Sequence, residues 1–243
     1  MVCALTLATP VAAASSRAKP HSRAAGVRAL RTAAAALDGG APAVEPTTAL
    51  KELAVRLPSL DRADRARARR MLARPAASVH AADVGSGDDH LFCSAHFCIH
   101  WTDAGADAPP LDSLLGDGIP DYIRAMSQVF EHVQQVENGS LGWREPRRDG
   151  TRGGDFNKVD VYVKDVGGAG IYGYSTPDPD QTGHSQTAYL VLDNDYAQAQ
   201  FPSYSDYLAP MEVTAAHEYN HVLQFSYDVY EETWFLESTA VWA

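Results

Sequence analysis

His217-Glu218-Tyr219-Asn220-His221 is the stretch that decides the fold of this 243-residue chain. On an α-helix, residues four apart lie one turn apart on the same face, so the imidazoles of His217 and His221 can converge on one metal ion. Glu218 stands beside the pair and can reach a water molecule held by that metal. The stretch therefore predicts a metal centre with a general base next to it.

The residues around this stretch favour a helix. Ala209-Pro210 suits a helix start, because proline has no N–H to lose in the first turn, and no Gly or Pro interrupts residues 211–227. Glu212 falls in the first turn, where the helix dipole favours an acid. The alternative is a helix whose two histidines are only hydrogen-bonded polar groups.

A catalytic zinc ion keeps three protein ligands and one water, so a third ligand is expected. The metzincin pattern would need a Gly and a His where this chain has Gln224 and Tyr227. Glu237 fits best, because it shares a face of the next predicted helix with apolar residues, where a lone carboxylate is costly unless a cation meets it. Glu231 and Glu232 are the alternatives, at the expected start of that helix.

The run Trp234-Phe235-Leu236-Glu237-Ser238-Thr239-Ala240-Val241-Trp242, taken with residues 217–224, resembles a bacterial family of secreted gluzincin metalloproteases. Upstream blocks similar to that family extend the resemblance from about Phe92 to the end of the chain: Asp117–Tyr122, Leu141–Trp143, Asp160–Tyr162 and Leu192–Tyr196. The resemblance implies a zincin-type fold. It also implies that His217, His221 and Glu237 are the zinc ligands and that Glu218 is the catalytic base.

The periodicity of the body predicts an α+β fold. Apolar residues three and four apart indicate an amphipathic helix over residues 122–136. Residues 90–101 and 159–163 alternate as strands do, the second one half-exposed, and residues 189–192 indicate a short buried strand.

This order of elements is typical of a zincin-like (gluzincin) fold, in which a mixed sheet has a backing helix and the helix that carries the metal ligands. In such folds an edge strand lies above the metal, and an extended substrate can add to it through main-chain hydrogen bonds. We expect Ala188–Leu192 to be that edge strand.

The charge of the chain is uneven. Residues 1–76 hold 13 Lys and Arg against 5 Asp and Glu, whereas residues 77–243 hold 7 against 26. This marks a boundary near Pro75 and excludes a nucleic-acid-binding core, because the acidic part would repel phosphates. No stretch reaches the 18 apolar residues of a membrane span, so no integral membrane segment is expected.

Three regions follow. Residues 1–14 resemble a secretory signal segment, which predicts a secreted, extracellular protein. Residues 15–76 are basic: residues 15–47 are expected to be disordered and residues 48–73 helical. We expect residues 15–76 to be a prosegment whose positive charge docks on the acidic enzyme. The alternative is a solvated basic linker. Residues 77–243 are the expected catalytic domain. Because the sequence ends at Ala243 inside a predicted helix, we expect the C-terminal subdomain of a gluzincin to be missing from it.

Two cysteines remain beyond the signal-like segment. In an exported protein, Cys93 and Cys98 favour a disulfide that closes a small loop. A structural zinc site that includes His96 and His100 is the alternative; otherwise these histidines are expected on the surface.

Acidic residues raise the question of a calcium ion. Asp112, Asp117 and Asp121, or Asp193 and Asp195, offer the oxygen ligands that Ca²⁺ prefers. Use of these residues in turns and helix caps is the alternative.

Together these patterns predict a secreted zinc metallopeptidase that hydrolyses peptide bonds of a peptide or protein substrate, with Glu218 as general base. The alternative from another class is a non-catalytic extracellular metal-binding or interaction module on the same fold. Glu218 separates the two, because a binding module does not need it.

Overall fold

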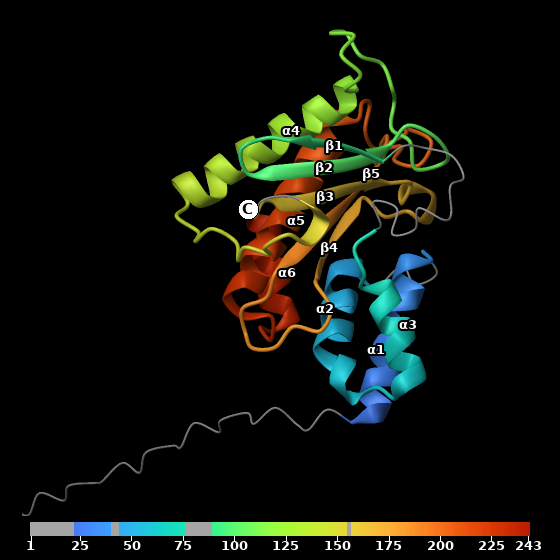
Figure 1. Cartoon of the computed structure of the whole chain (residues 1–243), viewed down its shortest axis with the longest axis vertical. Helices are drawn as coiled ribbons and strands as arrows, with labels where there is room; N and C mark the ends of the chain where they lie inside the picture. The colour runs from blue at the N-terminus through green and yellow to red at the C-terminus, as the bar shows by residue number, and fades with distance from the viewer. Residues whose placement is uncertain (1–21, 40–43, 76–88, 155–156) are drawn as a thin grey trace, which may run out of the picture.

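The computed structural model describes residues 22–39, 44–75, 89–154 and 157–243. The predicted signal segment, Cys3 and the start of the predicted catalytic domain at residue 77 lie outside the described residues. Figure 1 shows a small bundle of helices beside a larger body of sheet and helices. The elements are α1 (Arg23–Leu37), α2 (Pro46–Arg56), α3 (Arg62–Met71), β1 (Asp89–Cys93), β2 (Phe97–Thr102), α4 (Asp121–Gln134), β3 (Val159–Lys164), β4 (Gly173–Pro177), β5 (Ala188–Asp193), α5 (Leu208–Asp228) and α6 (Thr233–Trp242).

The body is α+β with a mixed five-stranded sheet in the order β1-β2-β3-β5-β4. The three central strands run parallel, and β1 and β4 pair antiparallel at the two edges. The expected edge strand was wrong: β5 is interior, and β4 is the edge strand on that side.

Helices α4 and α5 cover one face of this sheet (Figure 1). The apolar positions of α4, such as Met126 and Phe130, are fully buried against Phe97 and Ile99 of β2 and against α5. This confirms the predicted amphipathic helix, which continues as a π-helical turn over Gln135–Ser140. Burial of this apolar surface is the main driving force for the packing of the body.

The opposite face of the sheet is also covered, so β3 is buried rather than half-exposed. Tyr162 and Tyr189 pack edge to face there, and the Tyr189 hydroxyl donates a hydrogen bond to the carbonyl of Ala73 at 2.9 Å. The chain that leaves α3 therefore crosses this face, and the alternation of polar residues along β3 does not mark solvent.

Residues 90–101 form a hairpin instead of one strand. Ser94 N donates a hydrogen bond to the carbonyl of Phe97 at 2.9 Å, which closes the turn between β1 and β2. Cys93 and Cys98 face each other across this turn and form a disulfide.

The region expected to be disordered contains α1, so that expectation was wrong for residues 23–37. Ser22 caps the helix through its side chain, and small residues such as Ala29 and Ala33 pack against Leu50 and Leu53 of α2. Alanine-rich composition resembles that of disordered chains, but the buried alanines of α1 form an apolar helix face that packs in a core with α2. Residues 48–73 are largely helical, as predicted, in α2 and α3.

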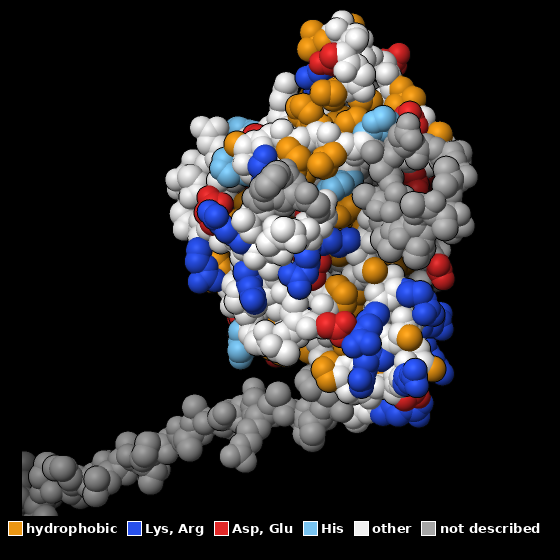
Figure 2. Space-filling view, in the orientation of Figure 1, with side chains coloured by type: hydrophobic (Ala, Val, Ile, Leu, Met, Phe, Trp, Pro, Cys, Tyr) orange, Lys and Arg blue, Asp and Glu red, His pale blue; other side chains and the backbone are white. Residues whose placement is uncertain are grey.

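Together α1, α2 and α3 form what we call the N-terminal helical module, which has its own apolar core. It lies beside β4 (Figure 1), and α2 is the helix that contacts this strand. Figure 2 shows Lys and Arg side chains gathered over the part of the surface that α1 and α3 form. The module is therefore a folded body that covers one sheet edge, not a solvated linker.

Candidate metal centre

Helix α5 carries the two histidines into the interior. It is buried along most of its length by α4, α6 and the sheet, and His221 is 0% exposed. Gly173 of β4 allows the close approach, because a Cβ there would lie 2.7 Å from a methyl group of Thr214. The glycine thus brings the edge strand against the helix turn that precedes His217.

The structure brings His217, His221 and Glu237 together. The two Nε2 atoms lie 3.2 Å apart, and the carboxylate oxygens of Glu237 lie 3.6 Å and 3.5 Å from His217 Nε2 and His221 Nε2. Two ligands bonded to zinc at about 2.0–2.1 Å with tetrahedral angles lie about 3.4 Å apart. The three groups therefore have the spacing that a tetrahedral zinc ion requires.

Glu237 Oε1 gives a second sign of fit. It is buried, and among the described residues it has no hydrogen-bond donor. Unpaired buried carboxylate oxygens are costly, so a cation at this place would remove a penalty. The carboxylate oxygens of Glu237 face the imidazoles of His217 and His221, and imidazole is a common zinc ligand in proteins.

A chain of amides fixes the orientation of His221. Its Nδ1 lies 2.7 Å from Gln224 Oε1 and donates to it, which leaves Nε2 as the lone-pair nitrogen that faces Glu237. The amide group of Gln224 donates in turn to Asn220 Oδ1 and to the carbonyl of Leu236. Asn220 donates to the buried Glu137 at 2.7 Å. The network sets the tautomer that a metal ligand requires.

Burial determines the charge state of the cluster. It lowers the pKa of His221 to about 3, with the charge of His217 adding to the effect, and it also lowers the pKa of His217. Burial raises the pKa of Glu237 to about 7. The imidazoles are therefore neutral at physiological pH, as metal ligands must be.

Glu218 lies beside the cluster and is 4% exposed. Its Oε2 accepts a hydrogen bond of 2.8 Å from the Thr47 hydroxyl, which belongs to α2. Burial raises the pKa of Glu218 well above its ordinary value, and the nearby charge of Glu45 raises it further. A buried carboxylate with a raised pKa is typical of a group that takes up and returns a proton.

The alternative ligands do not join the cluster. Glu231 directs its carboxylate to the backbone N–H of Glu232, and its carbonyl accepts a hydrogen bond from Lys51. His96 pairs with Glu131. Because Cys93 and Cys98 are disulfide-bonded, the alternative zinc site at these cysteines has no thiolates.

A second cluster lies on the far face of the sheet, and sequence reasoning missed it. Arg74 follows α3 and places its guanidinium among three buried carboxylates, those of Asp149, Asp160 and Asp178. His100 joins through a contact of 2.7 Å with Asp160 and is 7% exposed, so the expectation of a surface histidine was wrong.

The candidate calcium residues are used in turns and caps. Asp117 accepts from the backbone N–H of Ile119 and pairs with Arg124, and Asp121 accepts from Leu114 N. Asp193 accepts from Gly167 N at 2.5 Å and from Tyr196 N at 2.7 Å. Within the described residues, the one group of three side chains spaced for a metal ion is His217, His221 and Glu237.

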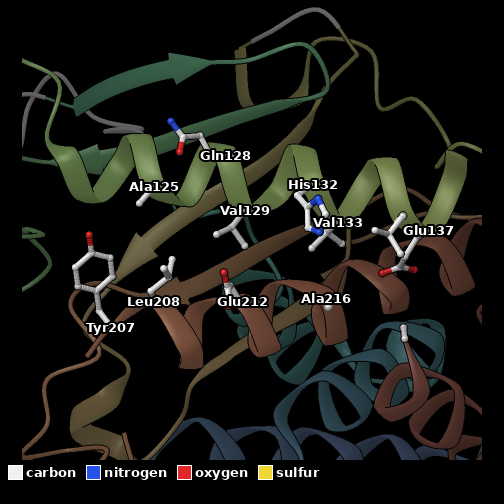
Figure 3. Close-up of a pocket in the computed structure, with 12 residues that line it drawn as sticks. Ala125, Gln128, Val129, His132, Val133, Glu137, Tyr207, Leu208, Glu212 and Ala216 are labelled. Atoms are coloured by element: carbon white, nitrogen blue, oxygen red, sulfur yellow. The ribbon is translucent and has the colours of Figure 1, made fainter. Parts of the chain in front are cut away.

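A cavity of about 660 Å³ adjoins the metal centre. His217 and Glu218 line it from α5, the segment that precedes β4 lines it from another side, and Glu45 of the N-terminal helical module closes it. A second cavity of about 630 Å³ lies between α4 and α5 and contains none of the candidate ligands (Figure 3). Of these two cavities, the first is the one that Glu218 lines.

The described helices include none with both the length and the apolar character that a membrane crossing requires. No protein-family model, curated protein or solved structure matches this chain.

Proposed function

We propose that this protein is a secreted zinc-dependent metallopeptidase of the gluzincin type. The observation that carries the proposal is the convergence of His217, His221 and Glu237, whose ring nitrogens and carboxylate oxygens lie 3.2–3.6 Å apart. The carboxylate of Glu218 lies on α5, the helix that carries the two histidines. A mixed sheet backed by α4, with α5 beneath the edge strand β4, supports a zincin-like fold for it. The Cys93–Cys98 disulfide supports export to an oxidising compartment.

The mechanism is metal-assisted hydrolysis of a peptide bond. Zinc held by His217, His221 and Glu237 would polarise the scissile carbonyl and acidify a water molecule. Glu218 would accept a proton from the water molecule that attacks the peptide carbonyl and would return it to the amine as the C–N bond breaks. The surroundings of Glu218 support this role, because a buried carboxylate with a raised pKa both accepts a proton readily and gives it back.

An extended peptide is the substrate that the edge of the sheet favours. Strand β4 has one side paired with β5 and the other side facing away from the sheet. A peptide that adds to this outer side through main-chain hydrogen bonds would lie along the cavity that contains Glu218. Peptides and unfolded proteins offer such extended backbone.

The test compares the wild-type chain with Glu218→Gln. The change keeps the shape of the side chain but removes the base, so we expect zinc content to stay at the wild-type level and casein hydrolysis to fall by about 10²–10⁴-fold. Metal content is measured by mass spectrometry, and hydrolysis by release of soluble peptides. Glu212→Gln is the matched control, because Glu212 lies on the same helix with its side chain exposed.

Two results would contradict the proposal. Hydrolysis that survives unchanged in Glu218→Gln would exclude Glu218 as the base. Bound zinc without hydrolysis of any peptide or protein, either by the wild-type chain or by a variant whose N-terminal helical module is loosened from β4, would favour a non-catalytic metal-binding module.

A further inference from the structure

Thr47 of α2 connects the N-terminal helical module to both parts of the proposed active site. Its hydroxyl donates a hydrogen bond to Glu218 Oε2 at 2.8 Å and accepts one from the backbone N–H of Ser175 in β4 at 2.9 Å. All three residues are buried. A single side chain therefore bridges the proposed base and the edge strand.

Both partners of Thr47 are groups that the reaction needs. Glu218 must contact a water molecule to accept its proton. The Ser175 N–H is directed away from β5, so it is a main-chain donor that an added peptide strand would use. With Thr47 in place, Glu218 Oε2 and the Ser175 N–H are both already hydrogen-bonded, so neither is free to bond to water or substrate.

The neighbouring residues of the module strengthen the obstruction. The Glu45 carboxylate caps α2 through the N–H groups of Thr47 and Thr48, each at 2.7 Å, so the start of the helix is held firmly. Glu45 and Pro46 line the cavity of about 660 Å³ together with His217 and Glu218. The module thus forms one wall of the space in which a substrate would lie.

Hydrogen bonds and ion pairs made by basic residues, away from the metal centre, hold the module in place. Lys51 donates a hydrogen bond to the carbonyl of Glu231 at 2.8 Å, Arg69 pairs with Asp180 at 2.8 Å, and Arg74 enters the cluster of three aspartates. Each contact joins a basic residue of the N-terminal region to an acceptor on the acidic body. This complementarity matches the opposite charges of the two regions.

A helix that covers a sheet edge can have a purely structural purpose, because exposed edges invite aggregation. Such a cover would need apolar contacts with β4 and no hydrogen bond to a catalytic carboxylate. Here the hydroxyl of a fully buried threonine lies between that carboxylate and the edge strand. The position of this hydroxyl favours a role in controlling access.

We propose that the N-terminal helical module is a built-in inhibitor of the metal centre, which must move away from β4 before an extended peptide can reach Glu218. The inference rests on the proposed peptidase function and specifies how that site is regulated.

The experiment uses the full chain with zinc and compares Thr47→Val with Thr48→Val. Valine at 47 keeps the shape of threonine and removes both hydrogen bonds. The hydroxyl of Thr48 donates to the carbonyl of Glu45 within the same helix start, so Thr48→Val is the matched control. Thr47→Ser, which keeps the hydroxyl, should restore the wild-type behaviour.

Two measurements are made on each variant. Hydrogen exchange followed by mass spectrometry reports the protection of residues 173–177, and casein hydrolysis reports turnover. We expect Thr47→Val to raise exchange in β4 and to raise kcat/KM by about tenfold, while Thr48→Val and Thr47→Ser stay at wild-type values. Unchanged exchange in β3 and β5 shows that the sheet remains folded.

The outcomes separate this inference from the proposed function. If β4 exchanges equally in Thr47→Val and Thr48→Val, the inhibitory role of the N-terminal helical module is overturned, whatever the activity. Raised exchange without raised turnover also overturns it, while hydrolysis by the wild-type chain leaves the peptidase proposal standing. Raised exchange with no hydrolysis in any variant overturns the peptidase proposal, and the inhibitory role with it.

Discussion

The cluster around Arg74 and the cluster around His221 both gather ionisable side chains inside the protein, but they differ in where the cation comes from. In the first, the guanidinium contacts three carboxylates whose side chains are 4%, 1% and 2% exposed. In the second, the described residues place only two histidines within ion-pair distance of Glu237.

The difference teaches how to distinguish a structural ionic cluster from a metal centre. Buried carboxylates need a positive partner, and the protein supplies one for Asp149, Asp160 and Asp178. For Glu237 it supplies only two imidazoles, which burial keeps neutral by lowering their pKa. The missing charge at the second cluster is what an external ion would provide.

Removal of Arg74 is the strongest way to break this comparison. Arg74→Met leaves three buried carboxylates without their cation, so we expect the free energy of unfolding to fall by about 3–5 kcal/mol. Urea denaturation in the presence of a chelator measures it. Arg69→Met is the control, since Arg69 and Asp180 are each 50% exposed, and such surface pairs contribute about 0–1 kcal/mol. Similar small losses in the two variants would show that the Arg74 cluster is not essential for stability.

Glu137 sharpens the comparison, because it is a buried carboxylate with neither an internal cation nor a place in the metal centre. It is 1% exposed, and its hydrogen-bond donor is the neutral amide of Asn220. Burial raises its pKa from 4.5 to about 7. At pH values below about 7, the protein accommodates this carboxyl group in its protonated form.

The raised pKa of Glu137 predicts the sign of a pH effect. Because the folded state binds this proton more tightly than the unfolded chain, the contribution is fully present below pH 4.5 and is lost as the pH rises through about 7. It amounts to about 3 kcal/mol. We expect Glu137→Gln to remove this loss, so that the metal-free variant gains about that much relative to the wild type between pH 4.5 and pH 8.

Denaturant unfolding at several pH values measures the effect, with Glu212→Gln as an exposed control that should follow the wild type. A Glu137→Gln curve parallel to that of the wild type would show that Glu137 titrates normally, and its burial would then need a cation that the structure does not identify.

The candidate metal centre could be anticipated from the sequence because its geometry is local. His217, Glu218 and His221 are placed by one helix, whose period fixes their relation. Glu237 belongs to the next helix, where its position on an apolar face was informative. The structure brings the side chains of His217, His221 and Glu237 together. The amphipathic pattern of α4 likewise predicted a helix that the structure contains.

The remaining features depend on contacts between distant parts of the chain. Thr47 meets Glu218 across 171 positions, and Arg74 meets Asp160 across 86, and no local pattern announces either pairing. The edge strand was assigned wrongly because the sequence analysis did not predict β4, a short strand whose sequence contains both Gly and Pro. The order of strands in a sheet is a property of the whole chain, not of each strand's sequence.

Gln224 offers the finest test of whether the metal centre is as firmly organised as the Arg74 cluster. Its Oε1 accepts from His221 Nδ1, and loss of such a partner costs about 10–100-fold in metal affinity, or about 1.4–2.7 kcal/mol. Gln224→Met should show this loss in zinc competition with a chromophoric chelator. Gln224→Glu keeps an acceptor for Nδ1 but loses the amide donors, so its zinc affinity should stay closer to that of the wild type.

If instead the two Gln224 variants lose zinc affinity equally, the donors to Asn220 and Leu236 matter and the acceptor does not. The packing between α5 and α6 would then hold Glu237 in place, and the imidazole of His221 would be oriented by its stacking on Phe225. Unchanged affinity in both would mean that the metal alone aligns its ligands. The centre would in that case differ from the Arg74 cluster in rigidity as well as in the source of its cation, since guanidinium contacts are fixed by the fold before any ion arrives.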